Sequence, residues 1–324
     1  MRASFGASLL GVTCVLSVSG CNPSTTPPAN DANLPDSGSI VDTGMVVLTC
    51  PTNMIPDPTN QMGACCYRES QAAHPEAPEL RLRFLRLRAP EGSALVSAAT
   101  GMLLNASLAN ETFNWLVRGA AGAGDGPITI TTGYGTRDAT ARTYAFSTTT
   151  RYAPVTLTGT ITGEVVTTAP TDQTLIVPIF DPTGTMLQVE LPLHNPAVVT
   201  STFSEDRSCI GALSTRAMFT TAATLTAYIT VTESQGTMIN VDPIHAQLCT
   251  LVASSGFTET GGPYCDQPQA MWANQPDSLC PASGQCMLDD GSGSVCSHDG
   301  TGATPCNAWQ LVGDFAAVGV EITP

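Results

Sequence analysis

Apolar and polar residues alternate in short runs along much of the chain, a pattern that is typical of half-buried β-strands. The segments between these runs are rich in Gly, Pro, Asp and Thr. A series of short strands joined by turn signals predicts an antiparallel β-sandwich or a barrel-like body. The predicted strands are Phe113–Arg118, Pro127–Thr132, Arg142–Ser147, Val155–Thr162, Leu175–Phe180, Met186–Leu193 and Leu225–Thr232.

Two of these strands are joined by a segment with a specific turn signal. Asp181-Pro182-Thr183-Gly184 has proline at its second position and glycine at its last, as type I turns prefer. It therefore predicts a tight turn between Leu175–Phe180 and Met186–Leu193.

An earlier run, Leu80–Arg88, alternates leucine or phenylalanine with arginine. The apolar residues fall on even-numbered positions up to Phe84 and on odd-numbered positions from Leu85 onward. A β-bulge near Phe84-Leu85 is therefore needed to keep the apolar side chains on one face of a strand. The arginines on the opposite face would suit an anion or glycan clamp. In an acidic protein we favour the alternative that they form a solvated strand face.

One segment has helical spacing together with a start signal and a stop signal. Ser93 is a suitable N-cap, and Asn110 would end the helix. The apolar stripe that we expect to face the core is Leu95, Ala98, Met102 and Ala106. The predicted fold class is thus mainly β with one packed helix over 93–109, and α+β is the alternative.

The N-terminus begins with Met1-Arg2, continues with an apolar run that ends near Val18, and reaches Ser19-Gly20-Cys21. A basic start, a short apolar run and small residues before the cut predict a signal peptide over 1–20. The run is too short for a membrane span, which needs about 20 residues. Val18-Ser19-Gly20-Cys21 resembles the lipobox of bacterial lipoproteins, which implies that Cys21 carries an acyl anchor such as palmitate.

The rest of the chain changes composition twice. Residues 21–44 are rich in Pro, Ser and Thr and predict a disordered tether. We expect a β-rich body over 45–255 and a cysteine-rich tail over 256–324. The tail ends in a predicted β-hairpin with a turn at Gly313-Asp314, which would pack on the body.

The cysteines indicate an oxidising compartment. Of the 12 cysteines, Cys14 belongs to the predicted leader and Cys21 to the anchor, which leaves ten. An even number in an exported chain predicts disulfides rather than metal thiolates, with the pairing left open. The disulfide candidates are Cys50, Cys65, Cys66, Cys209, Cys249, Cys265, Cys280, Cys286, Cys296 and Cys306.

The charge balance excludes several classes of function. The formal net charge is −15, so the surface repels nucleic acid. The chain contains no lysine. A P-loop, a Schiff base and a Ser-Lys dyad all need the lysine amine, and each is excluded.

No catalytic or cofactor motif emerges. There is no Gly-x-Ser-x-Gly element, and His74, His194, His245 and His298 have no evident partner. Asp289, Asp290 and Asp299 on a Gly-rich loop are calcium candidates, although their spacing departs from the EF-hand pattern. The aromatic residues that would suit a ligand groove, but fit a core equally, are Trp115, Tyr134, Tyr144 and Tyr152.

Further patterns resemble bacterial cell-envelope lipoproteins of uncharacterised activity: Cys50 to Cys65-Cys66-Tyr67-Arg68, Phe113-Asn114-Trp115-Leu116, and Cys306-Asn307-Ala308-Trp309 with the strand after it. The resemblance implies an anchor at the envelope, and Asn22 favours the outer membrane over the inner. We expect a structural role or the binding of an envelope protein or polysaccharide, without a cofactor. The alternatives are a hydrolase with a dispersed site and a lipid or small-ligand binder, which would have a closed apolar cavity.

Overall fold

The structure is a computed structural model. It describes residues 75–122, 124–181, 183–213, 219–241, 244–254, 265, 267–301 and 303–324, and two short strands at 55–56 and 67–68. The chain separates into two compact units, Met1–Val47 and Leu48–Pro324, and every described residue belongs to the second. The predicted signal peptide, the lipidation site Cys21 and the predicted tether therefore lie outside the described residues.

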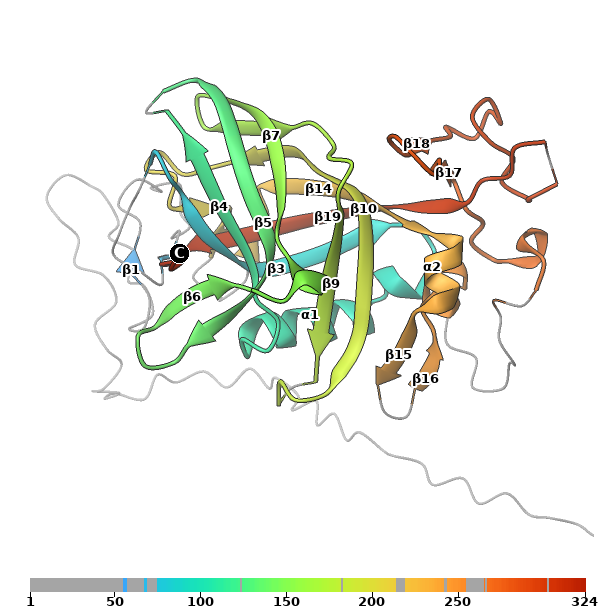
Figure 1. The fold of residues 1–324 in the computed structure, drawn as a ribbon, viewed down its shortest axis with the longest axis horizontal. Coiled ribbons are helices and arrows are strands. Elements are labelled where there is room, and N and C mark those ends of the chain that lie inside the picture. The colour runs from blue at the N-terminus through green and yellow to red at the C-terminus, as the bar shows by residue number, and fades with distance from the viewer. Residues whose placement is uncertain are drawn as a thin grey trace, which may run out of the picture. The chain divides into compact units, whose positions relative to one another are not determined.

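The described unit is built around a closed ring of antiparallel strands (Figure 1). Each strand pairs with the next, and the last strand, β19, pairs with both β14 and β3. The order is β3 (Glu79–Ala89), β4 (Trp115–Ala121), β5 (Gly126–Asp138), β7 (Val155–Thr162), β8 (Val165–Thr168), β10 (Leu187–Thr202), β14 (Ala223–Thr230) and β19 (Ala308–Gly319). Because the pairing closes, the ring is a barrel, and the predicted mainly β fold class is confirmed.

Shorter strands extend this sheet or form separate pairs. On the sheet are β6 (Thr143–Phe146), β9 (Thr174–Phe180), β11 (Cys209–Ile210), β17 (Ser278–Leu279) and β18 (Met287–Leu288). The separate pairs are β1 (Ile55–Pro56) with β2 (Tyr67–Arg68), β12 (Ala212–Leu213) with β13 (Phe219–Thr220), and β15 (Met238–Val241) with β16 (Ile244–Gln247).

The described residues contain few helical segments. They are η1 (Ala94–Val96), α1 (Ala98–Ala109), η2 (Thr150–Tyr152), α2 (Val231–Gly236), α3 (Leu248–Ala253) and η4 (Gln269–Met271). Within the described ranges, none of these helices is long and apolar enough to cross a membrane.

The strands predicted in the middle of the sequence are all present, and β7 has the predicted bounds. The Gly184 N–H donates to the Asp181 carbonyl over 2.8 Å, which confirms the tight turn between β9 and β10. Strand β10 continues well beyond its predicted end at Leu193. It passes Pro196 because its pairing with β14 shifts register there, so the missing N–H does not interrupt the ladder.

The helix predicted over 93–109 is present but begins later. Ser97, not Ser93, is the N-cap of α1, and its Oγ accepts the Thr100 N–H over 3.3 Å. Asn110 is the C-cap, as predicted. The extended backbone at Ser97 separates η1 from α1 and changes the helical phase, so most of the predicted core stripe is wrong. Leu95 is buried, but Ala98, Met102 and Ala106 are exposed, and α1 buries Leu104, Ser107 and Leu108.

The C-terminal segment differs most from its prediction. The predicted hairpin with a turn at Gly313-Asp314 is wrong, because Ala308–Gly319 is one continuous strand of the barrel. A Cβ on Gly313 would lie 3.1 Å from Leu85 Cδ1, so glycine permits close packing here. The Asp314 carboxylate accepts a hydrogen bond from Arg86 over 2.8 Å. Strand β19, from the predicted tail at 256–324, thus closes the barrel of the predicted body at 45–255.

Disulfides staple the region around this strand. The pairs are Cys249–Cys265, Cys280–Cys286 and Cys296–Cys306, and Cys209 is also disulfide-bonded. These pairs confirm a disulfide-rich C-terminal region, whereas Cys50, Cys65 and Cys66 lie outside the described residues. Stacking of Trp272 on the fully buried Trp309, with ring centroids 5.5 Å apart, joins the same region to the barrel.

Candidate functional site

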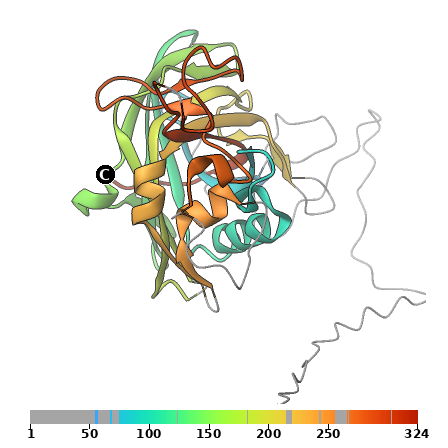
Figure 2. The same ribbon diagram turned by 90° about the vertical axis from the view of Figure 1, so that its right-hand side faces the viewer.

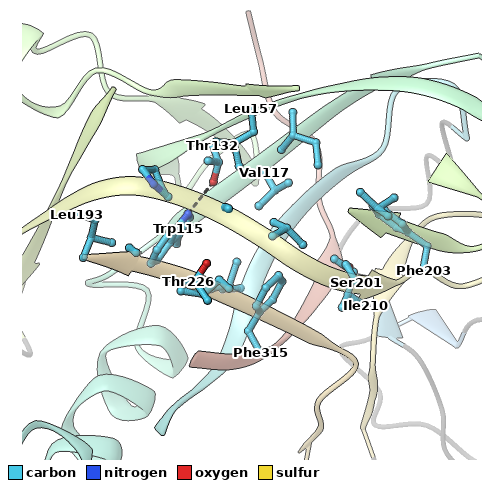
Figure 3. A pocket seen from close by; sticks show the side chains of 18 residues that line it. Trp115, Val117, Thr132, Leu157, Leu193, Ser201, Phe203, Ile210, Thr226 and Phe315 are labelled. Atoms are coloured by element: carbon cyan, nitrogen blue, oxygen red, sulfur yellow. Dashed lines mark hydrogen bonds between the residues drawn. The ribbon is translucent and has the colours of Figure 1, made fainter. Parts of the chain in front are cut away.

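Apolar side chains fill the interior of the barrel (Figure 3). Two hollows of about 40 and 30 Å³ remain between them. One water needs about 10–15 Å³, whereas a drug-sized ligand needs roughly 300–1,000 Å³. Trp115 points into the interior, and its Nε1–H donates to Thr132 Oγ1 over 2.7 Å. The barrel interior is therefore core, and Trp115 belongs to it.

The tyrosines weighed for a ligand groove also have packing roles. Tyr144 is 2% exposed and belongs to a second apolar cluster. Tyr134 packs edge-on against Tyr152, with ring centroids 6.0 Å apart, and both rings are half-buried. These contacts favour the core interpretation over a groove.

A larger cavity, of about 230 Å³, lies between the strand pair β9–β10 and the elements α1, β15 and α3. Its lining is almost entirely aliphatic, with contributions from every wall: Leu103 and Leu104 of α1, Ile179 of β9, Leu191 of β10, Ile239 of β15 and Leu251 of α3. The polar residues in the lining are Thr100 and Gln188. The Thr100 hydroxyl donates to the Ala94 carbonyl over 2.9 Å, so its hydrogen is used within the protein.

Hydrogen bonds hold the walls of this cavity in place. Asn105 of α1 donates to the Leu85 carbonyl of β3 over 2.9 Å and accepts the Leu85 N–H over 3.0 Å. The Ala94 N–H of η1 donates to the Ser254 carbonyl, which follows α3, over 2.8 Å. The end of α3 therefore lies next to η1, the segment that leads into α1, and these elements are seen on the same side of the barrel in Figure 2. The elements that form the walls of the cavity are thus tied to one another and to the barrel.

A β-bulge determines where Gln188 points. The register of the β9–β10 ladder shifts between Leu187 and Val189, so Gln188 is an extra residue without a Cα partner in β9. Its side chain is 7% exposed and lines the cavity. The Gln188 Oε1 atom has no hydrogen-bond partner among the described residues. The wall of the cavity is therefore almost entirely aliphatic, and the Gln188 oxygen is buried in the protein rather than exposed to the cavity.

A hydroxyl, an imidazole and a carboxylate meet elsewhere, where β9, β10 and α2 adjoin. His194 Nδ1 lies 3.0 Å from Thr174 Oγ1, and His194 Nε2 contacts Glu233 Oε2. A hydroxyl, an imidazole and a carboxylate connected in this order form the catalytic triad of hydrolases that use a hydroxyl nucleophile. Thr174 is exposed, however, and none of the four hollows described in this section and the next is lined by these residues.

Glu233 also has a structural role that accounts for its position. Thr230 caps α2 by accepting the Glu233 N–H over 3.2 Å, and its hydroxyl donates to Glu233 Oε2 over 2.8 Å. Burial raises the pKa of Glu233, but the hydrogen bonds from His194 and Thr230 lower that pKa by more. The group of residues is a clamp that joins α2 to β10.

The loop after β18 holds the calcium candidates. The Asp289 side chain is buried, and its oxygens accept a series of backbone N–H groups. The hydrogen bond from Val295 is the largest cause that lowers the pKa of Asp289, against the raising effect of burial. The donors are Gly291, Gly293, Val295 and Cys296. The carboxylate of Asp289 therefore stabilises the conformation of its own loop through these hydrogen bonds.

Asp290 and Asp299 make similar local bonds. Asp290 accepts the Ser292 N–H over 3.0 Å. Hydrogen bonds from Ser297 and Thr301 lower the pKa of Asp299 to about 2. No group of three or more His, Cys, Asp or Glu residues in the described ranges could hold a metal ion. The geometry of this loop thus gives the calcium hypothesis no support.

The other two histidines that the structure describes do not form a site. His298 Nε2 lies 3.3 Å from Asp289 Oδ1, at the edge of the acidic loop. His245 is exposed on β16, and His74 lies outside the described residues.

The arginines of β3 separate into two groups, and the prediction of a solvated face is wrong for Arg81. Arg81 is fully buried, where its Nη1 donates to the Leu108 carbonyl over 2.9 Å and to Asn114 Oδ1 over 3.1 Å. Its Nη2 lies 3.7 Å from Glu111 Oε1, and its guanidinium lies 5.4 Å from the centre of the Tyr144 ring. The C-terminal carbonyl of α1 and the carboxylate explain why a cation is buried here.

Arg86 and Arg88 are exposed, as predicted, and both pair with Asp314 over 2.8 Å. The predicted bulge in this strand is present close to its expected place. The register against β19 shifts between the partners of Leu82 and Phe84. None of these arginines lines the 230 Å³ cavity.

Sequence reasoning identified neither this cavity nor Gln188. Strict alternation places Gln188 on the outer face with Glu190, which accepts hydrogen bonds there from Arg151 over 2.8 Å and Tyr152 over 2.6 Å. The β-bulge places Gln188 on the inner face instead, and it depends on how β10 pairs with β9. No residue type in the segment predicts a bulge there. No protein-family model, curated protein or solved structure matches this chain. The cavity is accordingly the observation from which we infer a function.

Proposed function

We propose that this chain is a lipid-anchored cell-envelope protein whose β body binds a small, largely hydrocarbon ligand. The observation that carries the binding role is the aliphatic cavity of about 230 Å³ between α1, α3, β15 and the β9–β10 strands. The sequence favours a structural or macromolecule-binding role, but the cavity supports the small-ligand alternative, since pockets for such ligands are concave and mostly apolar.

The cavity volume limits the size of the ligand. An engineered cavity of about 150 Å³ lined by Leu, Ile and Phe binds benzene. A cavity of about 230 Å³ therefore suits a molecule of roughly eight to twelve non-hydrogen atoms. At about 24 cal/mol per Å³, filling it contributes about 5.5 kcal/mol, which corresponds to a Kd of about 0.1 mM.

A groove of about 490 Å³ between β3 and α1 is the closest feature to the macromolecule-binding expectation. It is lined by Phe84, Leu87 and the 70% exposed Met102, among others. A groove of this kind specifies no particular partner, so the aliphatic cavity of about 230 Å³ is the better-supported site.

The membrane anchor supports the same function. Val18-Ser19-Gly20-Cys21 has the sequence of a lipobox, and two acyl chains are enough for stable attachment. Small hydrocarbons partition into bilayers, so a protein held at the membrane surface has a local supply of them. Asn22 after the cysteine favours the outer membrane over the inner.

The anchor is tested by replacing Cys21 with serine in the full chain. Wild-type protein should incorporate an acyl label, fractionate with membranes and accumulate as a precursor in the presence of globomycin. Cys21→Ser should lose all three properties, because the acylated thiol is gone. Cys14→Ser, in the predicted leader, should retain them. Equal behaviour of the two variants would contradict the anchor.

Ligand binding is tested by thermal unfolding with 4-ethyltoluene, a hydrocarbon of suitable size. When the concentration of 4-ethyltoluene is a few times Kd, binding should stabilise the folded state by RT ln(1 + [L]/Kd), which is about 1 kcal/mol. This stabilisation raises Tm by about 2–4 °C. Leu103→Trp fills the cavity and should abolish the shift. The neighbouring Met102→Trp, on the exposed side of α1, should preserve it. A wild-type Tm that 4-ethyltoluene leaves unchanged would refute the binding function.

A further inference from the structure

We propose that the groove of about 490 Å³ between β3 and α1 docks an extended, acidic peptide segment of another protein, which pairs with the edge of β3 at Leu87. The apolar lining of the groove does not by itself specify a partner. The backbone edge that opens into the groove and the arginines beside it do. This role goes beyond the proposed function and does not depend on it.

The edge of β3 that faces α1 lacks a neighbouring strand along most of its length. Among the described strands, β4 pairs with β3 only from Glu79 to Arg81, and β19 lies on the opposite edge. Beyond Arg81 the helix α1 packs there, and Asn105 covers the edge at Leu85. The Asn105 Nδ2 donates to the Leu85 carbonyl over 2.9 Å, and its Oδ1 accepts the Leu85 N–H over 3.0 Å. A side-chain amide thus satisfies this residue as a neighbouring strand would.

The backbone of Leu87 points to the same side as that of Leu85. In an antiparallel ladder alternate residues turn their N–H and C=O to the same edge, and the register against β19 is regular from Leu85 to Leu87. Phe315, the partner of Leu85 in β19, turns its carbonyl to the other side, where it accepts the Ala222 N–H over 3.3 Å. Outside the ladder with β19, no hydrogen bond joins Leu87 to a described residue. Leu87 therefore presents one donor and one acceptor to the groove that it lines.

Gly101 leaves this edge accessible. The groove is lined by Leu87, which follows Leu85 on the strand, and by Gly101, which precedes Asn105 on the helix, so β3 and α1 run in opposite directions. Four helix residues span about 6 Å and two strand residues about 7 Å, which places Gly101 opposite Leu87. A Cβ on Gly101 would meet no atom within 4 Å. The space beside the Leu87 backbone is thus open to a peptide.

The side chains around this edge indicate the chemistry of the peptide. Val96 and the 70% exposed Met102 line the groove and suit an apolar side chain. Arg86 and Arg88 extend from the same end of β3, where both pair with Asp314 over 2.8 Å. A guanidinium has five N–H donors, so each arginine retains donors for a carboxylate of the partner. In a chain with a net charge of −15, these exposed cations favour an acidic segment.

The first test uses a fluorescein-labelled peptide with the sequence Glu-Val-Leu-Val-Glu, which has an apolar centre and acidic ends. Its fluorescence anisotropy should rise saturably on titration with the full chain. The peptide Lys-Val-Leu-Val-Lys should bind several-fold more weakly, although non-specific attraction to an acidic chain would favour it. A preference for the lysine peptide would show attraction to the acidic surface as a whole and would overturn the proposal.

Backbone pairing is tested with two N-methylated forms of the acidic peptide. One form is methylated at its first, third and fifth residues, and the other at its second and fourth. Alternate N–H groups of an extended chain face opposite sides, so only one form keeps the N–H that donates to the Leu87 carbonyl. That form should bind like the parent, and the other should bind about tenfold more weakly, which is the effect of one hydrogen bond. Equal affinities of the two forms would contradict pairing with β3.

Gly101→Leu is the variant that closes the groove. Its side chain should fill the space opposite Leu87 and abolish peptide binding. The melting temperature should not fall, because leucine favours a helix more than glycine does. Ala106→Leu is the matched control on α1, since Ala106 is exposed and does not line the groove, and peptide binding should be unchanged. Unchanged binding by Gly101→Leu would place the peptide elsewhere and overturn the proposal.

The outcomes are independent of the hydrocarbon-binding function. Gly101 does not line the cavity of about 230 Å³, so Gly101→Leu should keep the Tm shift with 4-ethyltoluene. Failure of the wild type to bind the acidic peptide overturns the peptide site alone. A wild-type Tm that does not respond to 4-ethyltoluene overturns the hydrocarbon site alone.

Discussion

A chain that ends at Asn307 is expected to lose its folded state completely, because it lacks β19. This strand pairs with β14 over Ala223–Thr230 on one side and with β3 on the other, so the ring cannot close without it. It also carries Trp309 and Phe315, which are 0% and 4% exposed in the core. The expected result is the absence of both a near-UV circular dichroism signal and a cooperative urea transition.

The control for this truncation keeps β19 and removes a nearby staple. Replacing Cys296 and Cys306 with serine opens a bridge with a sequence separation of 10. This should lower stability by roughly 2–3 kcal/mol in the loop-entropy account but leave a cooperative transition. If the C-terminal region were an appendage to a complete body, as its composition indicates, the truncated chain would still unfold cooperatively.

Replacing Arg81 with alanine is expected to cost about 3–5 kcal/mol in the free energy of unfolding. The guanidinium is 0% exposed, and its removal leaves the Leu108 carbonyl and Asn114 Oδ1 without this donor. Glu111 loses one of the two arginines that it pairs with, since its ion pair with Arg137 remains. A shift of the urea midpoint with an unchanged slope would measure this effect.

Arg86→Ala is the matched control on the same strand. The side chain of Arg86 is 62% exposed and its ion pair with Asp314 is solvated, so its loss should change stability by no more than about 1 kcal/mol. The sequence pattern makes the two arginines equivalent. Equal effects of the two substitutions would therefore support a solvated strand face and contradict the buried network around Arg81.

Local patterns predicted much of the fold correctly. The alternation in Val155–Thr162 gives β7 its bounds, because a half-buried strand leaves a period of two in the sequence. The turn at Asp181 and the C-cap at Asn110 were also predictable, since each depends on a few adjacent residues. The start of α1 was not, because Ser93 and Ser97 are both suitable caps and the contacts of η1 with α3 select the second.

Other features depend on which segments meet. Gly313-Asp314 has the composition of a turn. In the barrel, however, side chains of β3 and β14 pack closely on Gly313, while Asp314 pairs with Arg86 of β3 and accepts a hydrogen bond from Thr224 of β14. Arg81 and Arg86 share a repeat, yet only Arg81 lies at the end of α1. The orientation of Gln188 is set by the register of β10 against β9.

The sequence alone thus determined the mainly β character, the turn between β9 and β10, one helix with its end, and an even set of cysteines suited to disulfides, since these follow from composition and short-range periodicity. It also contains the lipobox pattern on which the anchor proposal depends. Only the tertiary structure decided that the ring closes through β19, that Arg81 is buried and that an aliphatic cavity holds Gln188. Those features arise from contacts between residues far apart in the chain, and no local pattern encodes which strands will pair or in what register.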